Sequence, residues 1–120
     1  MSTLKRILIV DDDLLVRWAL ERLLNAHGYQ TETSTHGVEA LGLLKRYRCG
    51  FDLVICDYML DGMNGGVVSL YIRDQCPGLP VLMISGLGPE RLPDFHNLVR
   101  KPWNNTALLA KIKTTIHAKT

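Results

Sequence analysis

The chain has 120 residues, of which 47% are hydrophobic and 22% charged, the composition of an ordinary globular domain rather than of a disordered chain or a coiled coil. A chain of this length buries roughly two-thirds of its unfolded surface, so we expect residues 1–120 to form one domain. Its 14 basic and 12 acidic residues give a net charge of +2, and the basic residues form no run, which argues against direct binding of nucleic acid.

The sequence also bears on the compartment. No apolar stretch approaches the ~20 residues of a membrane span, and the first six residues lack a signal-peptide pattern, so we expect a cytoplasmic protein without a membrane segment. The three cysteines, Cys49, Cys56 and Cys76, are odd in number and have no CxxC spacing, which argues against a disulfide framework and against a structural zinc site. We expect reduced thiols, with Cys56 in the core.

The first half of the chain alternates predicted strands and helices. The run RILIV is short, apolar and rich in β-branched residues, as in a buried parallel strand. Gly28 can end the first helix in a left-handed conformation. In order, the elements are a strand at 6–10, a helix at 14–27, a strand at 29–34, a helix at 38–47 and a strand at 51–56. The third strand therefore delivers Asp57 at its carboxyl end.

The second half continues the alternation with one irregular segment. It comprises a helix at 67–75, a strand at 80–84, a brief strand at 98–99 and a final amphipathic helix that includes 108–116 and is capped by Asn104 or Asn105. Between 86 and 97, Pro89 and Pro93 each disfavour helix around them. We therefore expect a fourth helix of about one turn, and an open parallel sheet of five strands covered on both faces by about five helices.

Polar side chains stand at the carboxyl ends of four predicted strands. They are Asp11 and Asp12, Asp57, Ser85 and Lys101. Parallel strands place such ends along one edge, where ligands bind in this fold class. Because clustered carboxylates repel one another, ionised ones need a cation, and oxygen ligands of this kind suit Mg²⁺. With a lysine and a hydroxyl beside them, the set offers the charge neutralisation that phosphoryl transfer needs.

Four segments of the chain, IVDDD, DLVICDYMLDGMNG, PVLMISG and LVRKPW, resemble the signature blocks of the response-regulator receiver family. The resemblance covers essentially the whole chain. It implies a doubly wound, flavodoxin-like α/β fold with strand order 2-1-3-4-5, here with a shortened fourth helix. It implies a signalling domain of a two-component phosphorelay, rather than an enzyme with a separate substrate.

The resemblance also implies roles for the acidic residues. Asp57 matches the position that accepts a phosphoryl group from a phosphohistidine. Asp12 matches a direct Mg²⁺ ligand, Asp11 a ligand through water, and Met59 a ligand through its backbone carbonyl, with Asp57 itself also binding the metal.

Three further positions carry roles by resemblance. Lys101 matches the lysine that pairs with the phosphoryl group, and the bond to Pro102 is expected to be cis, which proline allows at low cost. Ser85 matches the hydroxyl of the conformational switch. Leu98 stands at the switch position where family members commonly carry an aromatic residue, so we do not expect the usual aromatic readout.

The sequence departs from the family pattern elsewhere. Asp61 replaces a usual proline and Asn64 a usual aspartate, and only 15 residues separate Ser85 from Lys101. The face most often used for output or dimerisation is therefore altered, as in receivers of hybrid kinases and some stand-alone regulators. The expected partner is a histidine kinase or a histidine phosphotransfer protein, and the expected state is a monomer or a weak homodimer.

The alternative from another class is a pseudo-receiver, a docking module that is never phosphorylated, supported by the short fourth helix and Leu98. A flavin-binding protein is disfavoured because three aspartates after the first strand would repel the cofactor. An aspartyl-phosphate hydrolase needs a second Asp where Met59 stands. Met59 and Leu87 are both apolar and cannot orient an attacking water, so we expect a long-lived phosphoryl state.

Overall fold

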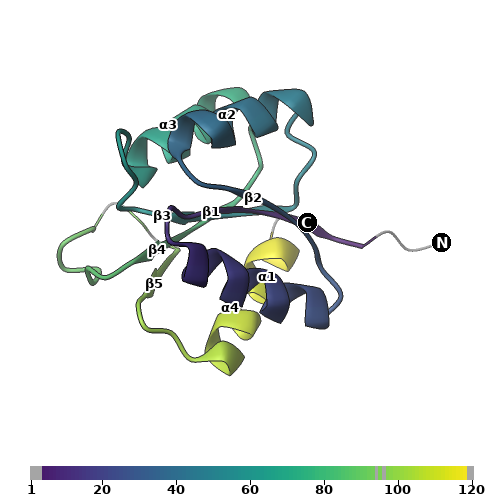
Figure 1. The fold of residues 1–120 in the computed structure, drawn as a ribbon, viewed down its shortest axis with the longest axis vertical. Coiled ribbons are helices and arrows are strands. Elements are labelled where there is room, and N and C mark those ends of the chain that lie inside the picture. The colour runs from purple at the N-terminus through teal and green to yellow at the C-terminus, as the bar shows by residue number, and fades with distance from the viewer. Residues whose placement is uncertain (1–3, 94, 96, 119–120) are drawn as a thin grey trace.

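The computed structural model describes residues 4–93, 95 and 97–118, which form one five-stranded parallel sheet (Figure 1). The strands are β1 (Arg6–Val10), β2 (Gln30–Ser34), β3 (Leu53–Asp57), β4 (Val81–Ser85) and β5 (Leu98–Arg100). Their order across the sheet is β2-β1-β3-β4-β5, and every neighbouring pair is parallel. The expected flavodoxin-like topology is confirmed.

Four helices in the described part of the chain cover the sheet. They are α1 (Leu14–Ala26), α2 (Gly37–Arg46), α3 (Gly65–Gln75) and α4 (Asn105–Ala118). Helices α2 and α3 lie on one face, and α1 and α4 lie on the other (Figure 1). Within the described residues, none of these helices combines the length and apolar character that a membrane crossing requires.

The central strand β3 shows how the two layers are built. Its side chains alternate between faces. Val54 and Cys56 join the core beneath α2 and α3, whereas Leu53 and Ile55 join the core beside α1 and α4. All five residues of β3 are buried, so the strand is fixed from both sides up to its carboxyl end.

The helix ends follow the sequence signals. Asp13 caps α1, where its side chain accepts hydrogen bonds from the backbone N–H groups of Leu15 and Val16. Gly28 follows this helix with φ of 88°, the left-handed conformation that favours glycine. Of the two candidate caps of the last helix, Asn104 is the one used, because its Oδ1 accepts the N–H of Ala107 at 3.0 Å.

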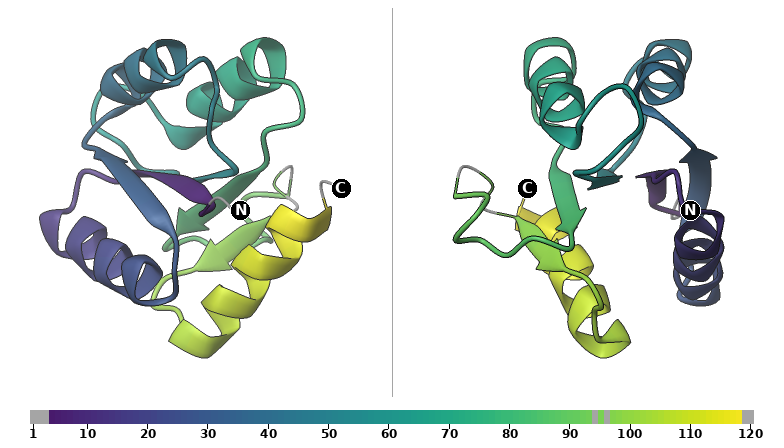
Figure 2. Two further views of the ribbon diagram at one scale, coloured as in Figure 1. Left: turned by 90° about the vertical axis from the view of Figure 1, so that its right-hand side faces the viewer. Right: turned by 60° about the vertical axis from the view of Figure 1, so that its left-hand side comes forward.

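The expected fourth helix is absent from the described part of segment 86–97, which consists of turns and bends. Figure 2 shows this segment as an open loop between β4 and β5 (right-hand view). The prediction of one helical turn is wrong for the described residues, because Pro89 and Pro93 together leave too few consecutive residues able to form helical hydrogen bonds. Two positions of the segment, 94 and 96, lie outside the described residues.

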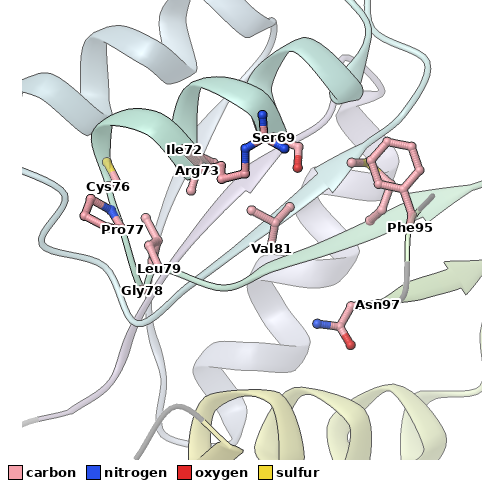
Figure 3. Close-up of a pocket in the computed structure, with 11 residues that line it drawn as sticks. Ser69, Ile72, Arg73, Cys76, Pro77, Gly78, Leu79, Val81, Phe95 and Asn97 are labelled. Atoms are coloured by element: carbon pink, nitrogen blue, oxygen red, sulfur yellow. The ribbon is translucent and has the colours of Figure 1, made fainter.

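A hollow of about 510 Å³ lies between α3 and the sheet near this loop. The residues that line it include Ile72, Cys76, Leu79, Val81, Phe95 and Asn97 (Figure 3). None of the strand-end residues Asp11, Asp57, Ser85 or Lys101 lines it. The hollow is therefore separate from the polar edge of the sheet.

The cysteines differ from expectation. Cys49, in the loop between α2 and β3, forms a disulfide with Cys76 at the end of α3, and their Cα atoms are 5.6 Å apart. The odd number of cysteines hid this pairing, because the odd one, Cys56, is a buried free thiol of the core, as predicted. Burial, together with the nearby carboxylates of Asp57 and Asp11, raises the pKa of the Cys56 thiol.

Gly42 offers a test of how α2 is stabilised. It is exposed in the middle of the helix, and a Cβ added there would meet no atom within 4 Å. Glycine inside a helix costs about 0.5–1 kcal/mol relative to alanine. We therefore expect Gly42→Ala to raise the free energy of unfolding by about that amount, measured by urea denaturation.

Gly37→Ala is the matched control in the same helix. A Cβ at Gly37 would collide with the side chain of Met63, so this variant should be no more stable than the wild type. A destabilised Gly42→Ala protein would contradict the assignment of position 42 to an unhindered helical site.

Candidate functional site

The site is built by the carboxyl ends of four adjacent strands. Asp11 follows β1, Asp57 is the last residue of β3, Ser85 is the last residue of β4, and Lys101 follows β5. Because these strands are parallel neighbours in the order β1-β3-β4-β5, their ends meet along one edge. The five residues predicted from the sequence, these four and Asp12, thus converge at this edge.

Three carboxylates form an acidic cluster, defined here as Asp11, Asp12 and Asp57. One carboxylate oxygen of each lies within 4.8 Å of those of the others. Asp11 and Asp57 are only 1% and 5% exposed, whereas Asp12 is exposed to solvent. The cluster therefore has two buried members at its base and one at its rim.

Lys101 is the cation of the site. Its Nζ lies 3.2 Å from Oδ2 of Asp57 and 3.3 Å from Oδ2 of Asp11. Burial alone would lower the pKa of Lys101, but the two carboxylates outweigh burial, and the pKa is raised. The ammonium group thus stays charged and bridges the two buried carboxylates.

Opposing influences act on the pKa of the Asp11 carboxyl. Burial, with the neighbouring Asp57 carboxylate, raises the pKa of the Asp11 carboxyl, against the lowering influence of the Asp13 N–H and of Lys101. The Asp13 N–H donates to Oδ1 of Asp11 at 2.8 Å, and Arg17 donates from its guanidinium to the Asp11 backbone carbonyl at 2.8 Å. Arg17 was not predicted, although its position one helical turn after Asp13 is a usable signal.

Ser85 is fully buried beside the cluster. Its Oγ accepts a hydrogen bond from the backbone N–H of Leu87 at 2.9 Å, which fixes the hydroxyl oxygen at the turn after β4. The hydroxyl retains a proton that it can donate. This proton is the one feature of Ser85 that can recognise an incoming oxygen atom.

The loop after Asp57 folds back on its own strand. The Met59 N–H donates to Oδ1 of Asp57 at 3.2 Å, and the Gly65 N–H donates to the Tyr58 carbonyl at 2.7 Å. A Cβ at Gly65 would lie 2.6 Å from the Asp57 carbonyl oxygen and 2.9 Å from the Tyr58 Cα. Gly65 is therefore a positioning residue that sequence reasoning missed, since only the through-space approach reveals why glycine is needed.

Two predicted residues lie at the margin of the site. Met59 is 62% exposed, and it contacts the acidic cluster through its backbone N–H, which donates to Asp57. Leu98 lies on β5, paired in register with Met83, and packs against the core beneath α2 and α3. The bond between Lys101 and Pro102 is cis, as the sequence predicts.

The charges of the site do not balance within the protein. Three carboxylates face the Lys101 ammonium group, and the Arg17 guanidinium lies against the Asp11 backbone, so the carboxylates outnumber the cations when all are ionised. Buried like charges are unfavourable without a counter-ion. The donor set consists of oxygen atoms, which hard divalent cations prefer, so the arrangement is typical of a divalent metal site next to a reactive carboxylate.

Comparisons with known proteins agree with this geometry. A family model described as response regulator receiver domain matches residues 7–113. The chain is 40% identical to "Response regulator MprA" of Mycobacterium sp. (strain KMS), over 92% of this chain and 50% of that protein. The chain thus spans about half the length of that relative.

Two solved structures share the fold across almost the whole chain. A receiver domain protein (CheY-like) from Methanospirillum hungatei JF-1 gives a TM-score of 0.90 at 28% identity, with 98% of this chain and 97% of that one covered. The receiver domain of the hybrid histidine kinase CckA gives 0.80 at 29% identity, with 92% and 98% covered. The chain therefore belongs to the response regulator receiver domain family, the phosphoaspartate signalling modules of two-component systems.

Proposed function

We propose that Asp57 is the phosphoacceptor of this receiver domain and that the donor is the phosphohistidine of a histidine kinase or a histidine phosphotransfer protein. The observation that carries the proposal is the position of Asp57, which is buried at the end of β3 with Asp11 and the Lys101 ammonium beside it. In the reaction an Asp57 carboxylate oxygen forms a bond to phosphorus. The phosphorus–nitrogen bond of the donor breaks, and its electron pair stays on the imidazole.

We propose Mg²⁺ as the cation of the acidic cluster. The fit rests on the donor set, three carboxylates with oxygen atoms within 4.8 Å of one another and a net negative charge. Asp12 and Asp57 would bind the ion directly, Asp11 through water, and Met59 through its backbone carbonyl. When bound, Mg²⁺ supplies positive charge to the oxygens of the transferring group.

The other residues of the site have distinct proposed tasks. Lys101 holds the Asp57 carboxylate in place before transfer and pairs with the added phosphoryl oxygens afterwards. Ser85 donates its hydroxyl proton to one of these oxygens. Ser85 pairs in register with Arg100 of β5, and Lys101 follows that strand. Their movement toward the phosphoryl group would shift β5 and its first residue, Leu98, which gives the readout.

The remaining assignments follow from the family. We propose that residues 1–120 constitute one receiver domain, that it acts in the cytoplasm, and that it is a monomer or a weak homodimer. The activity and the partners of any longer protein depend on sequence beyond this domain.

A docking module without phosphorylation is the second candidate. The lack of helix in the described part of segment 86–97 and the aliphatic Leu98 favour it. Trp103 follows the cis Lys101–Pro102 bond and lies close to the site, so Mg²⁺ should quench its fluorescence if the metal site is competent. A site that has lost its chemistry should give no quenching.

Phosphorylation is tested directly by intact-mass spectrometry. After incubation with acetyl phosphate and Mg²⁺, we expect the wild type to gain one phosphoryl group, roughly 80 Da, and Asp57→Asn to gain none. A chelator should abolish the gain, because without the cation the negative site repels the donor.

The outcomes separate the two candidates. A wild type that binds Mg²⁺ yet stays unmodified, even with a phosphohistidine donor, would contradict phosphoacceptance. A protein that neither binds Mg²⁺ nor accepts phosphate would favour the docking module.

The metal proposal makes a prediction about stability. Burial disfavours the ionised Asp11 carboxyl, so in a chelator Asp11→Asn should raise the melting temperature by a few degrees. In saturating Mg²⁺ the wild type should gain more stability than the variant, since ion binding to the folded state stabilises it. Circular dichroism melts with and without Mg²⁺ measure both effects.

Asp12→Asn is the matched control. Asp12 is exposed, so its removal relieves little burial cost in the chelator, yet it should also reduce the Mg²⁺-dependent gain. If both variants kept the full gain, the acidic cluster would not be the metal site.

The lifetime of the phosphoryl group gives a further prediction. Met59 and Leu87, two residues after Asp57 and Ser85 respectively, are apolar and cannot orient an attacking water by hydrogen bonding. We expect Met59→Gln to speed the decay of the phosphorylated protein about tenfold or more, since the amide can hydrogen-bond the attacking water and misplacement of a reacting group can cost on the order of 10²-fold in rate. Decay is followed by intact mass after removal of acetyl phosphate.

Alanine variants provide the comparison. Met59→Ala and Leu87→Ala add no polar group, so decay should stay as slow as in the wild type. Faster decay in these variants would mean that side-chain bulk excludes water, and the explanation by hydrogen bonding would fail.

A further inference from the structure

The disulfide between Cys49 and Cys76 joins segments that the phosphoryl site does not use. Cys49 lies four residues before β3, and Cys76 lies at the end of α3, five residues before β4. Both positions are therefore at the amino ends of the strands, whereas the acidic cluster is at the carboxyl ends. The third cysteine, Cys56, is buried within β3.

Backbone hydrogen bonds hold both cysteines independently of the bond between them. After α2 the chain turns through left-handed conformations at Arg48 and Cys49, with φ of 52° and 59°. The Cys49 N–H donates to the Leu44 carbonyl at 2.8 Å, and the Cys76 N–H donates to the Ile72 carbonyl at 2.8 Å. The fold thus keeps the two sulfur atoms within reach of each other when they are reduced, with little entropy left to lose on bond formation.

The two sulfur atoms differ in access. Cys76 is only 3% exposed and belongs to the core beneath α2 and α3, and Figure 3 shows it at one end of the hollow beside α3. Cys49 is partly exposed, with Arg48 next to it and Lys45 and Arg46 exposed in the last turn of α2. A small reagent therefore reaches Cys49 before Cys76.

We propose that Cys49 and Cys76 form a reversible thiol–disulfide switch that exchanges with low-molecular-weight disulfides and thiols of the glutathione class, with Cys49 as the sulfur that the small molecule meets. This inference is independent of the proposed phosphoryl chemistry. It assigns the domain a second responsive site at the opposite edge of the sheet.

The exchange is balanced in both directions. In oxidation, the Cys49 thiolate attacks the small disulfide and releases one small thiolate, and the Cys76 thiolate then attacks the Cys49 sulfur and releases the second. Two protein thiols and one small disulfide become one protein disulfide and two small thiols. Reduction is the reverse, starting with attack of a small thiolate on the sulfur of Cys49, the less buried of the two residues.

Oxidation has a structural consequence. The bond closes a loop from residue 49 to residue 76, with a sequence separation of 27, that contains β3, the loop after Asp57 and all of α3. Cross-linking restricts the unfolded chain and so stabilises the folded one. The stability of the segment that carries Asp57 thus depends on the redox state.

The first experiment is a redox titration of the wild type in glutathione buffers of varied thiol-to-disulfide ratio. Acid quenching, followed by alkylation of the unfolded chain and intact-mass spectrometry, should show two fewer alkylated thiols at the oxidising end, with a smooth transition between the ends. Reduction should lower the melting temperature by roughly 5–15 °C. A bond that no glutathione buffer reduces, or thiols that none oxidises, would overturn the proposal.

Single variants test the order of reaction. In Cys76→Ser, Cys49 should accumulate a mixed disulfide with glutathione, a gain of about 305 Da, whereas in Cys49→Ser the buried Cys76 should react much more slowly. Equal rates would contradict the role of Cys49. Cys56→Ala is the matched control, since it removes the third thiol and should leave the redox-dependent shift in melting temperature intact.

Discussion

The repulsion between two buried carboxylates, and the single ammonium group that bridges them, is the interaction on which the organisation of this domain depends. Asp11 and Asp57 are held almost free of solvent, and Lys101 contacts both. Neither carboxylate would be stable there alone, because burial of an unpaired charge is costly. With Asp12, the carboxylates still outnumber the ammonium group. This excess of negative charge lowers the stability of the folded state and favours the binding of a cation at the site.

Hydrophobic burial in the parallel sheet offsets the electrostatic cost of this acidic cluster. Asp11 follows β1 and Asp57 ends β3, two apolar strands that are buried on both faces, so burial fixes the backbone positions of both carboxylates. The crossover order brings β1 and β3, which are far apart in the sequence, into adjacent positions. The close approach of α3 at Gly65 then fixes the loop after Asp57. Hydrophobic burial in two layers thus offsets an unfavourable electrostatic arrangement at one edge.

The parts that depend on local pattern were predictable from the sequence, and the parts that depend on distance through space were not. Strand-end residues such as Ser85 and Lys101 follow apolar runs, so their convergence follows from the fold class alone. The Cys49–Cys76 pair depends on where a helix ends relative to a remote loop, and an odd cysteine count pointed the wrong way. The prolines of segment 86–97 indicated a weak helix, but local preference could not decide between one turn and none. Gly65 looked like any loop glycine, because its neighbours are set by packing.

Two elements connect the amino ends of the strands, where the disulfide lies, with the carboxyl ends, where the acidic cluster lies. Strand β3 begins four residues after Cys49 and ends at Asp57. Helix α3 begins after the loop that follows Asp57 and ends next to Cys76. A covalent bond between Cys49 and Cys76 restricts the segment that contains Asp57, the proposed phosphoacceptor, and the loop that follows it. The disulfide can shift the equilibrium between the phosphorylated and unphosphorylated states only if α3 is placed differently in them. A bond that fits both states equally well shifts no equilibrium. The disulfide holds the end of α3 beside Cys49, so oxidation favours whichever state of Asp57 keeps α3 in that position.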